Sequence, residues 1–340
     1  MSIKHLTKKG LVVFFAFLMI SSCRKELDQS PLDAFDSATF WTSEANATLA
    51  LTGVYRGNIS VNAANANPTD WWSYAGLLFM EFATDNAYDR RGDNSVFNKL
   101  TNGTLTPNVL VLGQYWTQSY ARIARANDFL ENIDKVTMNE ATKKRMKAEV
   151  RFLRACQYFY MSQFWGSVPL VTKLLTKEEA NTLDKASKAD VVNFTLTEFA
   201  EAANDLPRFK DIPASERGRA SKQAALAFLG RLQLAEGKYT NAASTYKSII
   251  DFGDNTIDPD YANIFLQSKE TSNENIFSAE FVENLAANGE SQHLWPAVAA
   301  GWHIFCPLGS IVESYDFTNG TAFSFSSPLY DPKDPTKNRD

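Results

Sequence analysis

The segment at residues 218–253 constrains the fold more than any other part of the sequence. Within it, Gly230 is followed twelve residues later by Ala242 and then by Tyr246, with a Glu-Gly-Lys turn between the two halves. This spacing matches the tetratricopeptide pattern, in which small residues let two antiparallel helices approach and an aromatic ring fills the seam. One such pair cannot bury its own apolar face, so we expect other helices to stack on it as degenerate repeats.

Three earlier segments show the apolar periodicity of helices. Residues 147–166 carry two apolar rows, which is typical of a helix packed on both flanks. Residues 118–134 and 189–206 each carry a single row, and Pro207 ends the last of them. The sequence therefore predicts a mainly α fold, with residues 110–255 as its main helical-repeat region.

The N-terminus has the pattern of an exported lipoprotein. Three lysines precede the apolar run at residues 10–20, which is too short to span a bilayer comfortably but suits a signal-peptide core. The tetrad that follows, Ile-Ser-Ser-Cys, resembles a bacterial lipobox. We therefore expect residues 1–22 to be removed and Cys23 to be acylated, each buried CH₂ contributing about 0.8 kcal/mol to membrane attachment. The alternative is an ordinary secretory signal with a chance cysteine.

The charge balance argues against a nucleic-acid-binding surface. The whole chain has 34 Lys and Arg against 39 Asp and Glu. Residues 1–22 hold three Lys and no acidic residue, so the mature balance is 31 against 39, or −8, whereas a nucleic-acid binder needs a basic face. Besides Cys23 the chain has only Cys156 and Cys306, so we expect no disulfide framework.

Several stretches, in this order, resemble the SusD/RagB family of outer-membrane nutrient-binding lipoproteins. They are the lipobox, the early pattern ATFWTSEANATLALTGVYRG, the helix EVRFLRACQYFYMSQFWGSVPLV, the pair GRASKQAALAFLGRLQLAEGKYTNAASTYKSII and the later NENIFSAEF. The Arg-Phe-Leu-Arg-Ala helix running into Phe-Trp-Gly-x-Val-Pro-Leu is the most specific of them. The resemblance covers nearly the whole chain.

This resemblance implies a mainly helical SusD-like domain at residues 23–340, with tetratricopeptide-like pairs on one side and a loop-rich ligand side on the other. It also implies a lipid-anchored protein on the outer face of the outer membrane. Such a protein captures oligosaccharides or peptides for a TonB-dependent (SusC-like) transporter, without a cofactor and without breaking a bond itself. Because the family usually continues further, the sequence looks truncated at its C-terminus.

Two adjacent tryptophans, Trp71 and Trp72, follow a turn-rich stretch at residues 62–70. Neighbouring side chains cannot share one face, so one ring can pack while the other looks outward. An exposed ring offers flat, rigid area that stacks on a ligand at little entropic cost. We count Trp71 among the ligand candidates; packing under a long loop is the alternative for Trp71 and the favoured interpretation for Trp72.

The loop that follows is a stronger ligand candidate. Its side chains combine one ring with carboxylate, amide and guanidinium groups that can hydrogen-bond sugar hydroxyls, and they belong to Asp85, Asn86, Tyr88, Arg90, Arg91 and Asp93. The alternative is a solvated charged loop.

A second aromatic cluster contains Trp295, which precedes a proline, and Trp302, which follows a glycine. Both rings therefore stand on chain kept out of regular elements, where they suit a stacking platform, although large aromatic residues are more often core. His293 and His303 flank them without a carboxylate or thiolate cluster, so we expect no metal site. We hypothesise that Trp295 or Trp302, with the loop at residues 85–91, forms a shallow carbohydrate-binding surface opposite the repeats.

The sequence leaves two alternatives of other function classes. A glycoside hydrolase needs two carboxylates several ångströms apart, which Glu81 with Asp85 or Asp89 could supply, but such acidic pairs are common on solvated helix faces. The sequence shows no nucleophile elbow, Walker loop or metal motif. A tetratricopeptide scaffold for protein partners is the other alternative, and an exposed aromatic platform would distinguish the ligand binder from it.

Overall fold

The computed structural model describes residues 40–57, 70–73, 76–270, 272–281 and 290–339. The predicted mainly α fold is confirmed. The helices are α3 (Glu44–Arg56), α4 (Gly76–Phe79), α5 (Leu110–Asn132), α6 (Glu140–Phe164), α7 (Lys177–Thr182), α8 (Lys188–Asp205), α9 (Lys222–Ala235), α10 (Tyr239–Phe252), α11 (Glu290–Leu294) and α12 (Gly309–Glu313), and the strands are β1 (Ala87–Asp89) and β2 (Phe305–Pro307). The predicted signal peptide, Cys23 and the stretch at residues 62–69 lie outside the described residues.

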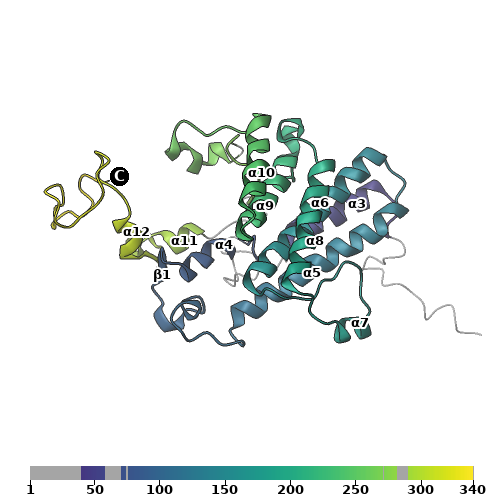
Figure 1. The fold of residues 1–340 in the computed structure, drawn as a ribbon, viewed down its shortest axis with the longest axis horizontal. Coiled ribbons are helices and arrows are strands. Elements are labelled where there is room, and N and C mark those ends of the chain that lie inside the picture. Colours follow the sequence, from purple (N-terminus) through teal and green to yellow (C-terminus); the bar gives the residue numbers. More distant parts are fainter. Residues whose placement is uncertain (1–39, 58–69, 74–75, 271, 282–289, 340) are drawn as a thin grey trace, which may run out of the picture.

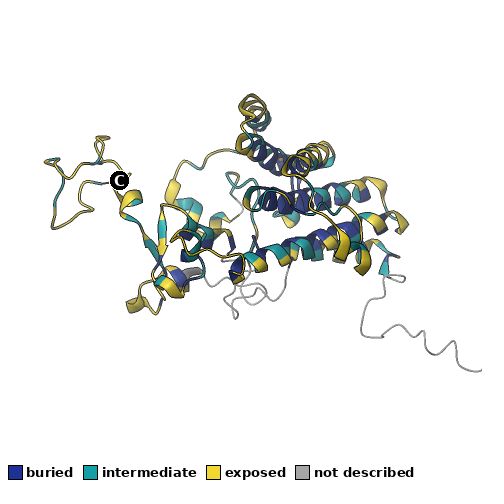
Figure 2. Cartoon of the chain, turned by 60° about the horizontal axis from the view of Figure 1, so that its bottom comes forward, coloured by how far each residue is buried: buried dark blue, intermediate teal, exposed yellow. Residues whose placement is uncertain are grey.

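The long helices stack in sequence order. Each helix of the series α3, α5, α6, α8, α9, α10 packs against the next, which is the arrangement of helical repeats. Figure 1 shows β1, α11 and α12 beyond one end of this stack, and Figure 2 shows buried residues gathered along the facing sides of the long helices. Among the described residues, no helix combines the length and apolar character that crossing a membrane requires.

Helix α6 forms the centre of the core. The Asn139 side chain accepts a hydrogen bond from the Thr142 backbone N–H and so caps the first turn. Phe152, which is fully buried, meets the rings of Phe199 on α8 and Phe228 on α9 at centroid distances of 6.0 and 5.6 Å. The predicted helix packed on both flanks is therefore confirmed.

The other predicted helices are present with shifted boundaries. Helix α8 lies within one residue of its predicted range, whereas α5 begins at Leu110, eight residues before the predicted start at 118. Gly113 weakens the helical signal in this first part. Val111 and Tyr115 are nevertheless each 1% exposed, so packing against the core supports two turns that local propensity did not predict.

The seam between α9 and α10 agrees with the tetratricopeptide prediction. The Tyr246 ring of α10 lies directly over Gly230 of α9, so that a Cβ atom on the glycine would be 2.7 Å from Tyr246 Cε1. Ala242 is 2% exposed. The two small residues thus let the helices approach, and the tyrosine ring fills the remaining space.

We expect Gly230→Leu to lower the free energy of unfolding by roughly 1–3 kcal/mol, because the new side chain must displace the Tyr246 ring. Urea denaturation measures the change. Gly113→Ala in α5 is the matched control, because a Cβ there has no other atom within 4 Å; we expect it to leave stability equal or slightly higher. Equal stability of Gly230→Leu and the wild type would contradict the close seam.

Buried ion pairs hold the helices in register. Glu149 of α6 is 0% exposed, and its carboxylate accepts hydrogen bonds from Arg219 Nη2 and Nε at 2.6 and 3.0 Å and from the Tyr55 hydroxyl at 2.7 Å. Arg145 Nε lies 3.1 Å from the same carboxylate. One acidic side chain of α6 therefore joins α3 to the segment that precedes α9.

Candidate functional site

A two-stranded antiparallel sheet brings the two predicted ligand segments together. β1 and β2 pair with Tyr88 opposite Cys306. The Leu308 N–H donates to the Asn86 carbonyl at 2.9 Å, and Ser310 Oγ donates to the Asp85 carbonyl at 2.8 Å. We call residues 85–93 and 292–310 the two-strand region. The sequence hypothesis placed these segments on one surface, and the described structure makes them direct neighbours.

Arg90 fastens one segment to the other. Its Nε donates to the His303 carbonyl at 2.9 Å and its Nη2 to the Trp302 carbonyl at 2.7 Å. Its backbone N–H donates to the Ile304 carbonyl at 3.0 Å. Three hydrogen bonds from one residue therefore fix the backbone that carries Trp302, so Arg90 contributes to the site mainly by positioning.

Arg91 is engaged in an ion pair. Its Nη2 lies 2.6 Å from Asp89 Oδ2, and Asp89 is 0% exposed. Burial opposes ionisation of Asp89, but hydrogen bonds from Arg91 and Ser95 outweigh it, so the pKa of this carboxyl is lowered from its ordinary value. The Asn98 amide bonds the backbone of Asp89 on both sides, accepting from its N–H and donating to its carbonyl.

The loop that carries the two tryptophans is tightly closed. The Trp302 N–H donates to the Gln292 carbonyl at 2.6 Å, and the His303 N–H donates to the Trp295 carbonyl at 3.0 Å. Gly301 is required in this loop, because a Cβ atom there would lie 2.0 Å from the Trp295 carbonyl oxygen. His303 also has a positive φ of 49°, which is uncommon for a side-chain-bearing residue. The aromatic rings thus stand on a constrained backbone.

Three rings of the two-strand region are partly open to solvent. Tyr88 is 43% exposed, Trp295 55% and Trp302 43%. The Trp302 ring meets the buried His293 ring edge to face at 4.9 Å, which leaves Trp302 supported but accessible. Rings that are held in place and half exposed can stack on a flat apolar ligand face.

The polar candidates of the region are also accessible. Asp85, Asn86 and Asp93 are exposed. Asn86 donates from Nδ2 to Glu81 Oε2 at 3.1 Å, and this bond leaves its side-chain Oδ1 able to accept a hydrogen bond from a ligand.

Trp71 corrects the sequence analysis. It is 1% exposed, its ring stacks on Tyr115, Tyr160 and Phe164 at 4.2, 4.9 and 5.1 Å, and its Nε1 donates to Ser119 Oγ at 2.9 Å. The expectation that Trp71 contacts a ligand is wrong in this structure, because both faces and the polar edge of the ring are covered. Trp72, for which packing was favoured, is half-buried, with the Arg122 guanidinium 4.8 Å from its ring centre.

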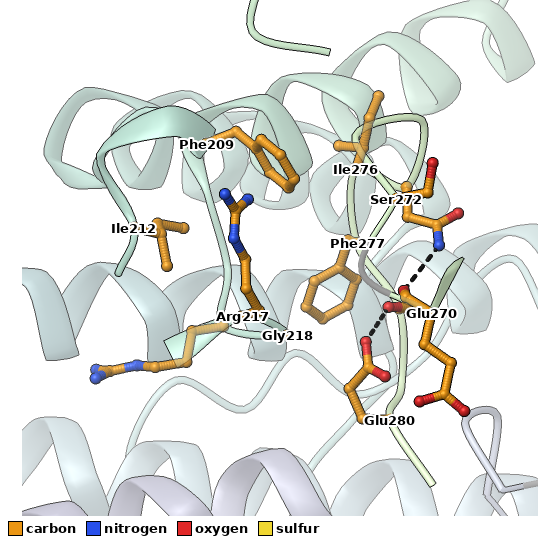
Figure 3. A pocket seen from close by; sticks show the side chains of 12 residues that line it. Phe209, Ile212, Arg217, Gly218, Glu270, Ser272, Ile276, Phe277 and Glu280 are labelled. Carbon is orange, nitrogen blue, oxygen red and sulfur yellow. Dashed lines mark hydrogen bonds between the residues drawn. The ribbon is translucent and has the colours of Figure 1, made fainter. Parts of the chain in front are cut away.

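A separate small pocket, with about 20 Å³ of internal space, lies between the segments at residues 209–219 and 270–280. Figure 3 shows Arg217 extended towards Phe209 on one wall, with Ile276 and Phe277 across from it. The guanidinium lies 4.3 Å from the centre of the Phe209 ring, which is itself 8% exposed. Since that ring is covered, this cavity lacks the open aromatic face that the two-strand region presents.

Two of the three carboxylates considered for hydrolysis, Asp89 and Glu81, have other partners. Both oxygens of Asp89 face Arg91 Nε at 3.0 Å, and Glu81 Oε2 accepts from Asn86. Within the described ranges, no group of three or more His, Cys, Asp or Glu side chains could hold a metal ion.

Sequence reasoning missed the residues that build the backbone of the region. Gly301 allows the chain to pass close to the Trp295 carbonyl, and the Asn98 side chain bonds the Asp89 backbone. Ser310 on α12 donates to the Asp85 carbonyl. The glycine before Trp302 was a visible signal, although its role as a close-contact position requires coordinates.

Comparison with known proteins places the chain among SusD-like proteins. A SusD-like family model, described as starch-binding and associating with the outer membrane, matches residues 37–234. SusD-like protein P25 of Formosa agariphila is 25% identical over 292 residues, covering 82% of this chain and 53% of that protein. The crystal structure of a SusD-like carbohydrate-binding protein from Bacteroides fragilis is 46% identical with a TM-score of 0.85, covering 89% of this chain and 59% of that one. A solved laminarin-binding SusD-like protein is 26% identical with a TM-score of 0.53, covering 61% and 43%.

The chain is therefore shorter than the proteins it matches. It spans 53% of the length of the Formosa relative and 59% of the Bacteroides fragilis chain.

Proposed function

We propose that this chain, which belongs to the SusD-like family, is a cell-surface lipoprotein that captures oligosaccharides for a TonB-dependent (SusC-like) outer-membrane transporter. The observation that carries glycan capture is the two-strand region, where Tyr88, Trp295 and Trp302 are each about half exposed. Sugar rings have apolar faces bordered by hydroxyls, so they fit a surface that pairs open aromatic rings with carboxylate and amide oxygens.

The proposal includes binding without bond cleavage. It is supported by the engagement of Asp89 with Arg91, which leaves that carboxylate unavailable as a general acid or base. We also propose that the mature protein begins at Cys23, that residues 23–340 belong to its SusD-like domain, and that acyl chains on Cys23 attach it to the outer membrane. The motive is the apolar run that ends in Ile-Ser-Ser-Cys.

We expect Trp295→Ala and Trp302→Ala each to weaken glycan binding by about 2- to 10-fold. A stacking aromatic contributes roughly 0.5–1.5 kcal/mol beyond the area that it buries, and this range converts to that change in affinity. Calorimetric titration with laminarin oligosaccharides, and with whichever glycan a binding screen selects, measures the loss. Thermal melts of the same variants show whether the fold is intact.

Tyr239→Ala is the matched control, because Tyr239 on α10 is 69% exposed but belongs to the helical stack. It should leave glycan affinity unchanged. If both tryptophan variants melt early while their folded fractions bind glycan normally, these rings are structural and the proposed site is misplaced.

A further inference from the structure

The two-strand region and its flanks carry an excess of acidic side chains. Residues 81–94 contain four acidic and two basic residues. Residues 292–316 contain two acidic residues, Glu313 and Asp316, and no lysine or arginine. The two segments that meet in the sheet therefore each have a formal charge of −2, not counting histidine.

The two arginines are already engaged. Carboxylate and sulfate groups are bound most specifically when two parallel N–H groups of one guanidinium fork donate to two oxygens. In Arg91 the Nε and Nη2 edge is used by Asp89, which also cancels its charge. In Arg90 the same edge is used by the carbonyls of His303 and Trp302. The Nε and Nη2 edge of each arginine is therefore unavailable to an anionic ligand unless the contacts that build the region break.

The region's exposed charged groups outside the Asp89–Arg91 ion pair are two carboxylates and the Arg90 guanidinium, whose bonds to neutral carbonyls leave its charge uncancelled. Asp85 and Asp93 are exposed, and no described lysine or arginine lies within ion-pair distance of either. Their oxygens can accept hydrogen bonds from sugar hydroxyls, but they repel carboxylate and sulfate groups on a ligand. Tyr88, Trp295 and Trp302 provide uncharged stacking area beside them.

We propose that the two-strand region selects uncharged glycans and discriminates against glycans that carry uronate or sulfate groups. The inference rests on the proposed glycan-binding function and names the ligand class of that same site. Arg90 and Arg91 act in it as positioning residues, which hold Trp302 and the β1 loop, rather than as readers of anionic sugars.

Binding of the full chain to a panel of immobilised polysaccharides tests the selection. The panel pairs uncharged β-glucans, mannans and xylans with polygalacturonate, alginate and a sulfated galactan. We expect binding to be confined to uncharged members, with affinity nearly independent of salt, because no counterions are released. Preferred binding to an anionic member would overturn the charge selection while leaving glycan capture standing. Binding to no member of the panel would instead contradict the proposed function itself.

A charge variant then tests whether the acidic side chains cause the selection. In the Asp85→Asn, Asp93→Asn double variant, the affinity for uncharged glycans divided by the affinity for anionic glycans should fall roughly threefold at low ionic strength. The decrease should be smaller at physiological salt. Glu178→Gln combined with Asp184→Asn is the control, because it removes equal charge near α7, which Figure 1 shows far from β1. If the two double variants change this affinity ratio equally, or if neither changes it, the acidic side chains of the two-strand region do not cause the selection.

Discussion

Glu149→Ala is expected to lower the free energy of unfolding by about 3 kcal/mol. Removing one partner of a buried ion pair typically costs about 3–5 kcal/mol, because the remaining charge stays in a poorly solvated place. Here Arg219 keeps a second carboxylate, Glu216 Oε1, at 2.7 Å, which places the effect at the lower end of that range. The Tyr55 hydroxyl also loses its acceptor. Burial and the neighbouring carboxylate hold the pKa of Tyr55 well above its ordinary value, so this hydroxyl remains a neutral donor.

Urea denaturation followed by circular dichroism measures this effect. Lys147→Ala is the control on the same helix, because its ion pair with Asp134 joins side chains that are 33% and 65% exposed. An exposed pair of this kind contributes about 0–1 kcal/mol. If Glu149→Ala is no more destabilising than Lys147→Ala, the carboxylate does not hold α3, α6 and the segment before α9 together.

The helical part of the fold could be predicted because its signals are local. Gly230, Ala242 and Tyr246 are separated by helical spacing within one hairpin, and the seam that they form follows from that spacing. The start of α5 could not be predicted in this way. It depends on Val111 and Tyr115 packing against elements that are distant in the chain.

The sequence predicted that the two candidate segments share one surface, but it did not predict which partners their charged residues have. Glycine and proline beside the tryptophans indicated irregular chain, and Trp295 and Trp302 are indeed exposed on it. Arg90 was predicted to contact a ligand because the sequence does not show its hydrogen-bond partners. These partners lie 212 and 213 positions away in the chain. The sequence shows which chemical groups a charged loop residue carries. Which partners those groups bond to depends on the tertiary structure.

The two adjacent tryptophans illustrate the same limit. Residues 70–73 lie in a turn rather than in a helix or strand, so no periodicity indicates which ring is buried. Asp70 decides the geometry: its carboxylate accepts a bond from the Trp72 N–H at 3.0 Å and pairs with the buried Arg122 at 2.7 Å. This anchored turn directs the Trp71 ring into the core.

Trp71→Ala is therefore expected to lower the free energy of unfolding by about 3–5 kcal/mol while the folded fraction binds glycan with wild-type affinity. Truncating a large buried aromatic residue removes its transfer free energy and leaves a cavity. For Trp71 that cavity would open among Tyr115, Tyr160 and Phe164, whose rings now stack against it. Thermal and urea denaturation measure the stability, and calorimetric titration of the folded protein at low temperature measures the binding.

Trp71→Phe separates packing from hydrogen bonding at the same position. It keeps an aromatic ring in the stack but removes the Nε1 bond to Ser119 Oγ, which is buried, so we expect it to destabilise by about 1–3 kcal/mol. Trp302→Ala should show the opposite behaviour, with a clear loss of glycan affinity and a smaller loss of stability, because its ring is 43% exposed. If the Trp71→Ala protein is as stable as the wild type but no longer binds glycan, Trp71 contacts the ligand and its assignment to the core is wrong.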